Sequence, residues 1–505
     1  MSYLGIDIGT TGCKAVVFSY TGQVLGQSYY EYQTISPKPG WFELDSHNVL
    51  TSCKNVIAQA SNQAKCIDPV VAIGISSQGE AFTLFDKNNK YLCNAMVSFD
   101  TRSTMQVDEF CRSFGSKKLY QITGHSAHTL FSLFKLLWIK QHKPQIFNNI
   151  HRFFCFGDLL TYELTGQRTI SYNLAARTML FDINRLCWSE EILDAIGIDK
   201  AILPKPVPAG YLAGKIKNRI ADELGLSKNV TVAAGGHDQS CGALGVGVTG
   251  PGTAAYSIGT VECLTPAFKE CVLNDKMQDS NFATYPYTVE HLYTTVAFNM
   301  TGGNLLKWYR DNFGQYEIQL AQKTGKDSYD LLLKDLPDNP TSIMVLPHFT
   351  STGTPYFNPS PVGAIIGLNL NTDKRHIIKA ILEGLTYEIK LNLELLKKAG
   401  IEITNIRAFG GGARNSAWMQ IKADILNVPI TSLEVTEAGC LGAAMLAAKA
   451  IGDITSLEDC TKTWVKPNAT YEPSLKDVLQ YQESFEIYSK LYDVINPFSK
   501  MINKL

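Results

Sequence analysis

The chain has 505 residues and a formal net charge of −1, from 46 lysine and arginine residues against 47 aspartate and glutamate residues. This balance gives no electrostatic case for a nucleic-acid partner or an anionic membrane surface. Because 45% of the residues are hydrophobic and the length exceeds one ordinary core, a disordered protein is excluded and two or more domains are expected.

A strand, a turn and a second strand are predicted over residues 3–18, where β-branched residues flank the turn Gly9-Thr10-Thr11. The elements predicted next are a helix capped by Asp45 or Ser46 and ending near residue 64, a strand over 70–76 and a helix near 130–139.

The same arrangement returns at residues 253–264, where two predicted strands flank a second Gly-Thr turn at Gly259-Thr260. The two turns are separated by about half the chain, which predicts two similarly built halves. Residues 245–252 form the predicted linker. We therefore expect one domain at residues 1–246 and a second at residues 253–505.

The second half contains a long predicted helix that is capped by Thr372 or Asp373, carries one apolar stripe and ends at Gly400. A strand, the tight turn Gly410-Gly411-Gly412 and a helix over residues 415–426 follow. Helices that alternate with short apolar strands predict an α/β protein.

The twelve cysteines are scattered along the chain, and no two of them form a CxxC pair. This spacing argues against a zinc ribbon or a redox dithiol and fits a reducing compartment. The N-terminus enters a strand without the pattern of a signal peptide, and no apolar run approaches the 18 residues of a membrane span. The sequence therefore predicts a cytoplasmic protein.

Three short motifs are candidates for chemistry. The first is Asp7 beside the turn Gly9-Thr10-Thr11, because successive backbone N–H groups at a glycine turn form an anion nest that suits phosphate. Asp7 would hold Mg²⁺ through water, and Lys14 would neutralise phosphate charge. The alternative is an ordinary hairpin turn with an exposed aspartate.

The second motif is Gly235-Gly236-His237-Asp238-Gln239, which follows an apolar strand. A carboxylate at the C-terminal end of a strand is placed to accept a proton from a substrate hydroxyl. The alternative role for Asp238 is a helix N-cap, and His237 has the alternative of a packing residue.

The third motif is the run of three glycines at 410–412, followed by Arg414 and Asn415, between a strand and a helix. Close approach of a flat or phosphorylated ligand explains three glycines better than packing does, whereas a plain tight loop needs only one or two.

One further glycine pattern does not fit its usual role. Gly245-x-Gly247-x-x-Gly250 matches the dinucleotide fingerprint, but Pro251-Gly252 stands where the helix should open. A nicotinamide-dependent dehydrogenase is therefore disfavoured.

Taken together, the motifs resemble those of the FGGY carbohydrate kinases, in the actin/Hsp70/sugar-kinase superfamily. The first family signature resembles residues 132–142, apart from Leu130, where an aromatic, Met, Gly or Ser is usual. The second resembles residues 363–383. Residues 41–45, 172–188 and 441–444 are similar to the family pattern as well.

The resemblance implies an α/β fold of two ribonuclease-H-like (actin-like ATPase) domains around an interdomain cleft, with ATP and Mg²⁺ as cofactors. Asp238 would be the general base, and Asp7 would position Mg²⁺. The residues facing the phosphates would be Gly9, Thr10, Thr11 and Lys14, with Gly259 and Thr260 in a second hairpin. The residues bordering the adenosine would be Gly303, Lys307, Gly411, Gly412 and Asn415.

The loop Gln78-Gly79-Glu80 bears on the substrate, because its counterpart is similar to Gln-Met-His in xylulokinases and Gln-Arg-Glu in glycerol kinases. Glu80 would accept hydroxyl hydrogen bonds. Gly79 lacks the arginine of glycerol kinases, which disfavours glycerol and would leave room for a longer polyol or ketose. Leu130, where glycerol kinases usually place a tyrosine, also disfavours glycerol.

Asp100 is a second candidate contact for a polyol, because residues 99–102 resemble the Asn-Asp-x-Arg of xylulokinases, and its alternative is a surface-loop carboxylate. The full substrate-binding set predicted is Gln78, Glu80, Asp100, His237 and Gln239. The favoured substrate is a ketopentose such as xylulose, with ribulose, a tetritol or a deoxysugar left open.

Two other functions remain alternatives on this fold. One is a non-catalytic sugar or nucleotide sensor, whose expected mark would be the loss of Asp238 or Asp7, yet both are present. The other is an actin- or chaperone-like ATPase acting on protein partners, which would leave the polar set around Glu80 unexplained. The expected partner is a small sugar or polyol, with no nucleic acid or membrane, and a homodimer is compatible with the family.

Overall fold

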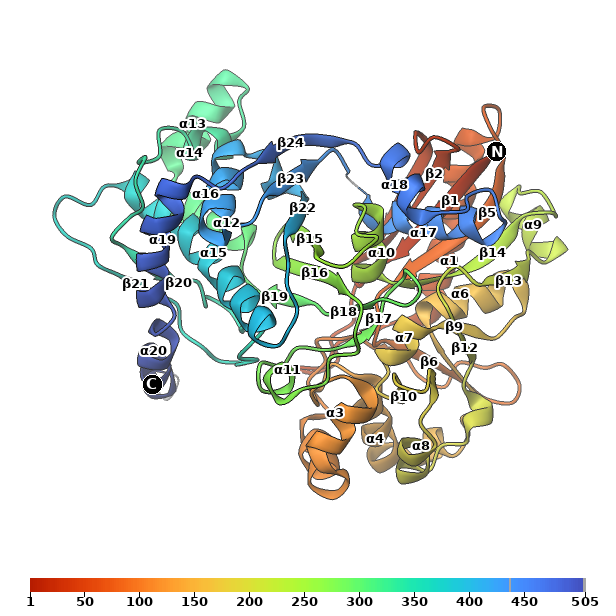
Figure 1. Cartoon of the computed structure of the whole chain (residues 1–505). Coiled ribbons are helices and arrows are strands. Elements are labelled where there is room, and N and C mark those ends of the chain that lie inside the picture. Colours follow the sequence, from red (N-terminus) through yellow and green to blue (C-terminus); the bar gives the residue numbers. More distant parts are fainter. Residues whose placement is uncertain (436, 503–505) are drawn as a thin grey trace.

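Two mixed β-sheets, one from each half of the chain, form the centre of a computed structural model that describes residues 1–435 and 437–502 (Figure 1). The first sheet has the strand order β13-β14-β5-β1-β2-β3. Its strands are β1 (Ser2–Ile8), β2 (Gly12–Ser19), β3 (Val24–Glu31), β5 (Val70–Ser77), β13 (Leu212–Lys215) and β14 (Thr231–His237).

The second sheet has the order β17-β18-β16-β15-β22-β23-β24, with β19 also paired to β16. Its strands are β15 (Thr253–Ile258), β16 (Glu262–Phe268), β17 (Tyr285–Pro286), β18 (Tyr293–Thr294), β19 (Ala297–Asn299), β22 (Asn405–Phe409), β23 (Ile430–Leu433) and β24 (Pro467–Tyr471). In each sheet the first strand pairs antiparallel with the second and parallel with a later one. The prediction of two similarly built halves is confirmed.

Short strand pairs outside the two sheets hold the connecting segments. They are β4 (Glu43–Leu44) with β7 (Ala95–Met96), β6 (Phe82–Phe85) with β8 (Arg152–Cys155), β9 (Thr169–Ser171) with β12 (Lys205–Val207), β10 (Phe181–Asp182) with β11 (Cys187–Trp188), and β20 (Met344–Leu346) with β21 (Ala364–Ile366).

The long predicted helices form where their caps indicate. Asp45 accepts hydrogen bonds from the backbone N–H groups of His47 and Asn48 at the start of α1 (Ser46–Ala64). Asp373 does the same at the start of α15 (Lys374–Lys398), and Gly400 follows that helix with a positive φ of 98°. The predicted apolar stripe joins the core of the second half, but residues 378–390 are buried on every side of α15 and not on one face alone.

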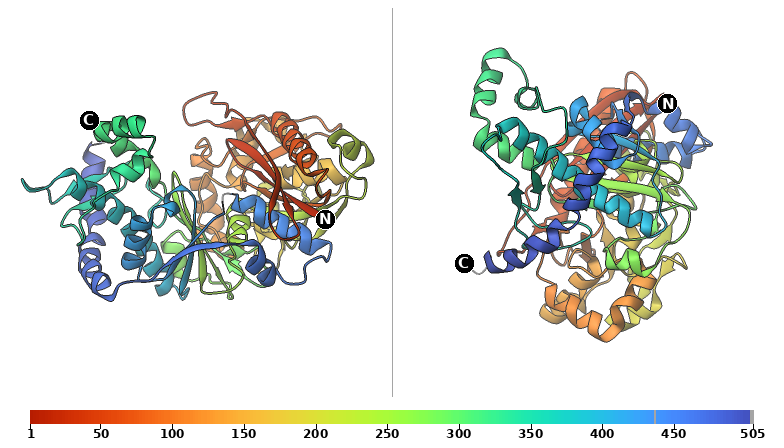
Figure 2. Two further views of the ribbon diagram at one scale, coloured as in Figure 1. Left: turned by 90° about the horizontal axis from the view of Figure 1, so that it is seen from above. Right: turned by 60° about the vertical axis from the view of Figure 1, so that its left-hand side comes forward.

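Further helices surround the sheets (Figure 2). In the first half they are α2 (Thr104–Phe110), α3 (Ser116–Thr123), α4 (Ser132–His142), α5 (Pro144–Phe147), α6 (Phe156–Thr165), α7 (Tyr172–Ala176), α8 (Glu190–Ile196), α9 (Asn218–Leu224) and α10 (Asp238–Gly245). In the second half they are α11 (Asp275–Asp279), α12 (Gly303–Phe313), α13 (Gln315–Thr324), α14 (Ser328–Leu332), α16 (Ser416–Leu426), α17 (Ala438–Ala450), α18 (Leu457–Trp464), α19 (Leu475–Tyr488) and α20 (Leu491–Ile502).

Helix α17 departs from the expected division of the chain, because it packs against strands β1 and β5 of the first sheet and crosses α10. Glycines permit this contact: a Cβ added at Gly5 would lie 1.8 Å from the carbonyl oxygen of Cys440, and one at Gly74 would lie 1.9 Å from that of Ala443. In α18, Trp464 donates to the carbonyl oxygen of Tyr20. The segment from α17 to α18 therefore lies against the first sheet, although it follows residue 253 in sequence.

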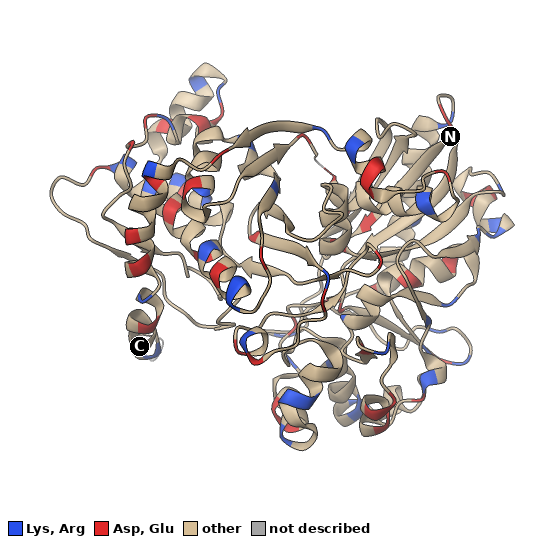
Figure 3. Cartoon of the chain, viewed as in Figure 1, with Lys and Arg blue, Asp and Glu red and all other residues tan. Residues whose placement is uncertain are grey.

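Acidic and basic residues are interspersed over both halves (Figure 3). Among the described residues, none of the helices has the length and apolar character needed to cross a membrane.

Candidate active site

Three neighbouring cavities lie where the two halves meet and along the second half. The central cavity, of about 220 Å³, is lined by Asp7, Asp238 and Glu437 among others. The polar cavity, of about 230 Å³, shares Asp238, Gln239 and Cys263 with it and extends into the first half. The glycine-lined cavity, of about 670 Å³, lies in the second half beside Gly259 and Gly411.

Asp7 reaches the central cavity from the end of β1. Its Oδ1 accepts a hydrogen bond of 2.6 Å from the hydroxyl of Ser76 on the neighbouring strand. Burial raises the pKa of Asp7, and the Ser76 hydrogen bond opposes that rise. Gly439 permits the close approach of α17, because a Cβ there would lie 2.9 Å from Asp7 Oδ2.

Asp238 stands at the first position of α10, with His237 before it at the cap. Its Oδ1 accepts a 2.6 Å hydrogen bond from the backbone N–H of Gln239 and lies 3.2 Å from Nε2 of His237. No hydrogen bond within the described residues reaches Oδ2. Burial, followed by the charges of Asp7 and Glu80, raises the pKa of Asp238 to about 8.

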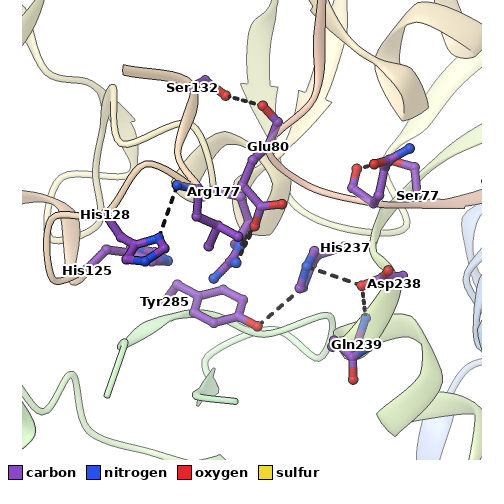
Figure 4. Close-up of polar contacts among 12 residues, drawn as sticks. Ser77, Glu80, His125, His128, Ser132, Arg177, His237, Asp238, Gln239 and Tyr285 are labelled. Carbon is purple, nitrogen blue, oxygen red and sulfur yellow. Dashed lines mark hydrogen bonds and ion pairs between the residues drawn. The ribbon is translucent and has the colours of Figure 1, made fainter. Parts of the chain in front are cut away.

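The imidazole of His237 completes a row with Asp238 and Tyr285 (Figure 4). The hydroxyl of Tyr285 lies 3.4 Å from His237 Nδ1. Burial, together with the positive charge of Arg177, lowers the pKa of His237, so the ring is neutral near pH 7. A neutral ring that donates from Nε2 to Oδ1 leaves Oδ2 of Asp238 as the oxygen open to the cavities.

The first Gly-Thr turn joins β1 to β2 above the central cavity. Gly9 donates its N–H to the carbonyl oxygen of Gly12 and accepts from the hydroxyl of Tyr32. Thr10 donates to Gln78 and lines the polar cavity, whereas Gly9, the exposed Thr11 and Lys14 line none of the three cavities.

Lys14, which the sequence predicts to face the phosphates, forms a 2.6 Å ion pair with Glu437. Its ammonium group also lies 5.5 Å from the ring centre of Tyr29. Its charge is thus already paired at the edge of the central cavity.

The glycine-lined cavity brings together all the residues predicted to border adenosine, along with the second Gly-Thr turn. They are Gly259, Thr260, Gly303, Lys307, Gly411, Gly412 and Asn415. Asn415 is the N-cap of α16, where its side chain accepts from the backbone N–H of Trp418. Sequence reasoning missed Asn304, Asp327, Tyr329 and Trp418 on the same walls.

A buried ion pair ties the second Gly-Thr turn to the glycine-rich loop. Lys422 on α16 lies 2.9 Å from Glu262, which follows the turn, and also donates to the hydroxyl of Tyr256. Both charged side chains are fully buried. The pair fixes the spacing of the two walls of the glycine-lined cavity.

The polar cavity collects Gln78, Glu80, His237 and Gln239 from the predicted substrate set, together with Asp238, the predicted general base. It also holds Arg177, which the sequence analysis did not single out, although the residues around it carried part of the family resemblance. Other lining residues are His125, Leu130, Phe131, Phe298, Met300 and Phe357. The cavity therefore has polar groups from the first half and apolar side chains facing them.

Asp100 is not part of this cavity, and its prediction as a substrate contact needs correction. The residue is fully buried, and it accepts hydrogen bonds from the backbone N–H of Phe42 and from the side chain of Arg102. Arg102 in turn pairs with Glu43 at 2.8 Å. These bonds use both carboxylate oxygens, so Asp100 acts as a structural partner of the 42–43 segment.

The prediction that Gly79 leaves room for a longer polyol or ketose is also wrong. A Cβ added there would lie 2.9 Å from Cβ of Arg177 and 3.2 Å from Cδ2 of His237. The side chain of Arg177 occupies this space instead.

Two repeated α/β units with an acidic cavity lined by both, a small polar cavity that shares residues with it and a glycine-lined cavity in the second half are typical of a two-domain phosphotransferase of the actin-like ATPase class. Comparison with known families agrees. The N-terminal domain of the FGGY family of carbohydrate kinases matches residues 2–245, and its C-terminal domain matches residues 254–451. The chain belongs to this family and is an ATP-dependent carbohydrate kinase.

Relatives within the family differ in substrate. The chain is 29% identical to the xylulose kinase of Bacillus subtilis (strain 168), covering 97% of this chain and 96% of the relative. It is 30% identical to the glycerol kinase of Acidiphilium cryptum (strain JF-5), and the match covers 94% of this chain and 95% of the relative. The crystal structure of a xyloylose kinase from Brucella ovis superimposes with a TM-score of 0.89 at 28% identity, covering 99% and 100%.

Valine at Gly411 should impair nucleotide binding selectively. A Cβ at Gly411 meets nothing within 4 Å, and the residue lines the glycine-lined cavity, so a larger side chain would enter that cavity without disturbing the fold. We expect the KM for ATP to rise about tenfold, with little change in the KM for the sugar.

The matched control for this experiment is Gly250→Val, because Gly250 is equally open but lies in the linker. Steady-state kinetics with varied ATP would compare both variants with the native enzyme. An unchanged KM for ATP in Gly411→Val would argue against nucleotide in this cavity.

Proposed function

We propose that this kinase transfers the γ-phosphoryl group of ATP to a terminal hydroxyl of a ketopentose such as xylulose, with Asp238 as general base. The observation that carries the proposal is the position of Asp238, which lines both the central and the polar cavity and has one oxygen, Oδ2, that no hydrogen bond from the described part of the chain reaches. The similarity to xylulose kinases over nearly the full length supports the ketopentose.

In this mechanism the sugar lies in the polar cavity with its reacting hydroxyl at Oδ2 of Asp238. In the ionised form of Asp238, Oδ2 accepts the proton as the hydroxyl oxygen attacks the γ-phosphorus, while Gln239 and the neutral His237 hold Oδ1. Phosphoryl transfer depends mainly on position and charge neutralisation, which the Gly-Thr turns and Lys14 would supply. For Lys14 this requires that phosphate compete with Glu437 for its ammonium group.

Mg²⁺ is part of the proposal, and the residues present fit it. The central cavity is lined by the carboxylates of Asp7, Asp238 and Glu437, and hard oxygen ligands with bound water are what Mg²⁺ prefers. Asp7 would hold the ion, since Ser76 already fixes one of its oxygens. When bound, Mg²⁺ neutralises the charge of the phosphates.

The proposal can be tested by measuring ADP release from Mg-ATP in the presence of each candidate substrate in turn. The substrates are D- and L-xylulose, D- and L-ribulose, erythritol, L-fuculose, gluconate and glycerol. One ketopentose should exceed the others, and Asp238→Ala should abolish its turnover. Turnover of glycerol above the ketoses would overturn the substrate assignment. Sugar binding without turnover would favour a sensor, and ATP hydrolysis without sugar would favour an ATPase that acts on proteins.

A cytoplasmic location also belongs to the proposal, because all twelve cysteines are free thiols and six of them are buried in the hydrophobic cores. A homodimer stays a prediction from the family.

A further inference from the structure

The ion pair between Arg177 and Glu80 lies on a wall of the polar cavity. Nε of Arg177 donates to Oε1 of Glu80 at 2.6 Å, and Nη2 of the same guanidinium donates to that oxygen as well. The rings of Phe131 and Tyr285 lie 5.1 and 5.7 Å from the guanidinium carbon and help to hold it in place. Ser132 anchors the loop by donating to the carbonyl oxygen of Glu80.

Two atoms of this pair are left for a ligand. Within the described residues, neither Nη1 of Arg177 nor Oε2 of Glu80 takes part in a hydrogen bond. Neither atom is among the polar atoms that are buried without a partner, so both remain accessible from the cavity. Both residues line the cavity. The wall therefore presents a donor and an acceptor side by side.

The absence of a side chain at Gly79 allows Arg177 to lie beside Glu80 on the wall of the polar cavity. An added Cβ would lie 2.9 Å from Cβ and 3.0 Å from Cγ of Arg177, closer than non-bonded carbon atoms approach. A side chain at position 79 and Arg177 in its present place therefore exclude each other. The chain lacks the arginine of the glycerol-kinase loop, and Arg177, from the segment after α7, occupies the space beside position 79 with its Cβ and Cγ.

We infer that Arg177 and Glu80 recognise the hydroxyketone end of an open-chain ketose, an inference that rests on the proposed function. Nη1 of Arg177 would donate to the carbonyl oxygen, and Oε2 of Glu80 would accept from the adjacent hydroxyl. A carbonyl oxygen only accepts, so it suits a guanidinium, which only donates. A polyol hydroxyl in the same place must find a further acceptor for its own proton.

The direction of the substrate follows from His237. Its ring lies between the ion pair and Asp238, since it is within 3.2 Å of Asp238 and of the Cβ position at Gly79 (Figure 4). A ketose with its carbonyl at Arg177 thus points its other end at the general base. The open-chain form is required because ring closure consumes the carbonyl group.

The native enzyme alone gives the first test. We expect kcat/KM for D-xylulose to exceed that for xylitol and D-arabinitol, its two reduction products, by at least about 100-fold, and the same contrast for ribulose and its polyols. Equal turnover of ketose and polyol would overturn this inference while leaving the kinase intact. Turnover of no sugar or polyol at all would overturn the proposed function instead.

Arg177→Lys gives the second test, because lysine keeps the charge but loses the fixed fork of donors. The KM for the ketose should rise, and the ratio of ketose to polyol kcat/KM should fall about tenfold. Gly79→Ala should lower the same ratio by displacing Arg177.

The matched control is Arg102→Lys, since Arg102 is also a buried arginine on a carboxylate in the first half but does not line the cavity. It should leave the ratio unchanged, whatever its effect on stability. An equal loss of ketose and polyol activity in Arg177→Lys would mean that Arg177 serves only as a structural partner of Glu80.

Discussion

Asparagine in place of Asp238 is expected to lower kcat by about 10³-fold. In the absence of nucleotide and Mg²⁺, the same substitution is expected to make the protein more stable at pH 8. The loss of activity follows because an amide cannot take the proton of the attacking hydroxyl. The gain in stability follows because Asp7 and Glu80 repel a buried carboxylate at this position and an amide carries no charge.

The sign of the pH dependence can be worked out from the raised pKa. The carboxyl of Asp238 titrates near 3.8 in an unfolded chain and at about 8 in the folded protein. Between these values the folded protein holds a proton at Asp238 that the unfolded chain has lost, so the contribution of Asp238 to the stability of the native enzyme falls as the pH rises from 4 to 8. The advantage of the variant should grow over this window and level off above it.

Thermal midpoints of the two proteins between pH 5 and 9 would measure this, and a difference of about 2 °C is expected at pH 8. Asp100→Asn is the opposite-sign control, because it leaves the buried Arg102 without part of its partner and should lower the midpoint. A variant of Asp238 that is active, or whose difference in midpoint from the native enzyme does not grow between pH 5 and 8, would contradict the assignment.

Sequence reasoning succeeded where the signal was local. The two Gly-Thr turns, the aspartates at strand ends and the caps of α1 and α15 each depend on a few neighbouring residues, and the structure has them where they were expected. Packing fails to explain the glycine run only at Gly411, where an added Cβ meets nothing within 4 Å; at Gly412 it would lie 2.3 Å from Cγ2 of Ile258, and Gly410 has a positive φ of 96°.

Sequence reasoning failed where a residue's contact partner is distant in sequence. Arg177 meets Glu80 only because α7 brings it beside a loop nearly a hundred residues earlier, and nothing at Gly79 indicates that this space is filled. Asp100 resembled a substrate contact, but one of its carboxylate oxygens accepts a hydrogen bond from the backbone N–H of Phe42, which is far away in sequence. The packing of α17 on the first sheet depends on glycines in strands that precede it by more than 350 residues.

Alanine at Gly442 is expected to destabilise the protein by at least about 3 kcal/mol, through overpacking of two helices. Its Cβ would lie 1.9 Å from the carbonyl oxygen of Cys241, and Gly245 on α10 approaches Ala438 of α17 equally closely. Helix propensity alone predicts the opposite sign, since alanine favours a helix over glycine by about 1 kcal/mol. The contact decides the sign of the change in stability because the atom that the new Cβ meets belongs to the backbone of α10. It can move away only if the whole helix shifts.

Gly242→Ala is the matched control, because Gly242 also lies in a helix but a Cβ there meets nothing within 4 Å. Thermal unfolding should place it at or above the native midpoint and Gly442→Ala far below. Helix α10 begins with Asp238, and α17 begins beside the carboxylate of Asp7 on β1, so forcing the helices apart disturbs the packing around both carboxylates. Any folded fraction of Gly442→Ala should therefore have a lower kcat, and native stability with native kcat would contradict the described crossing.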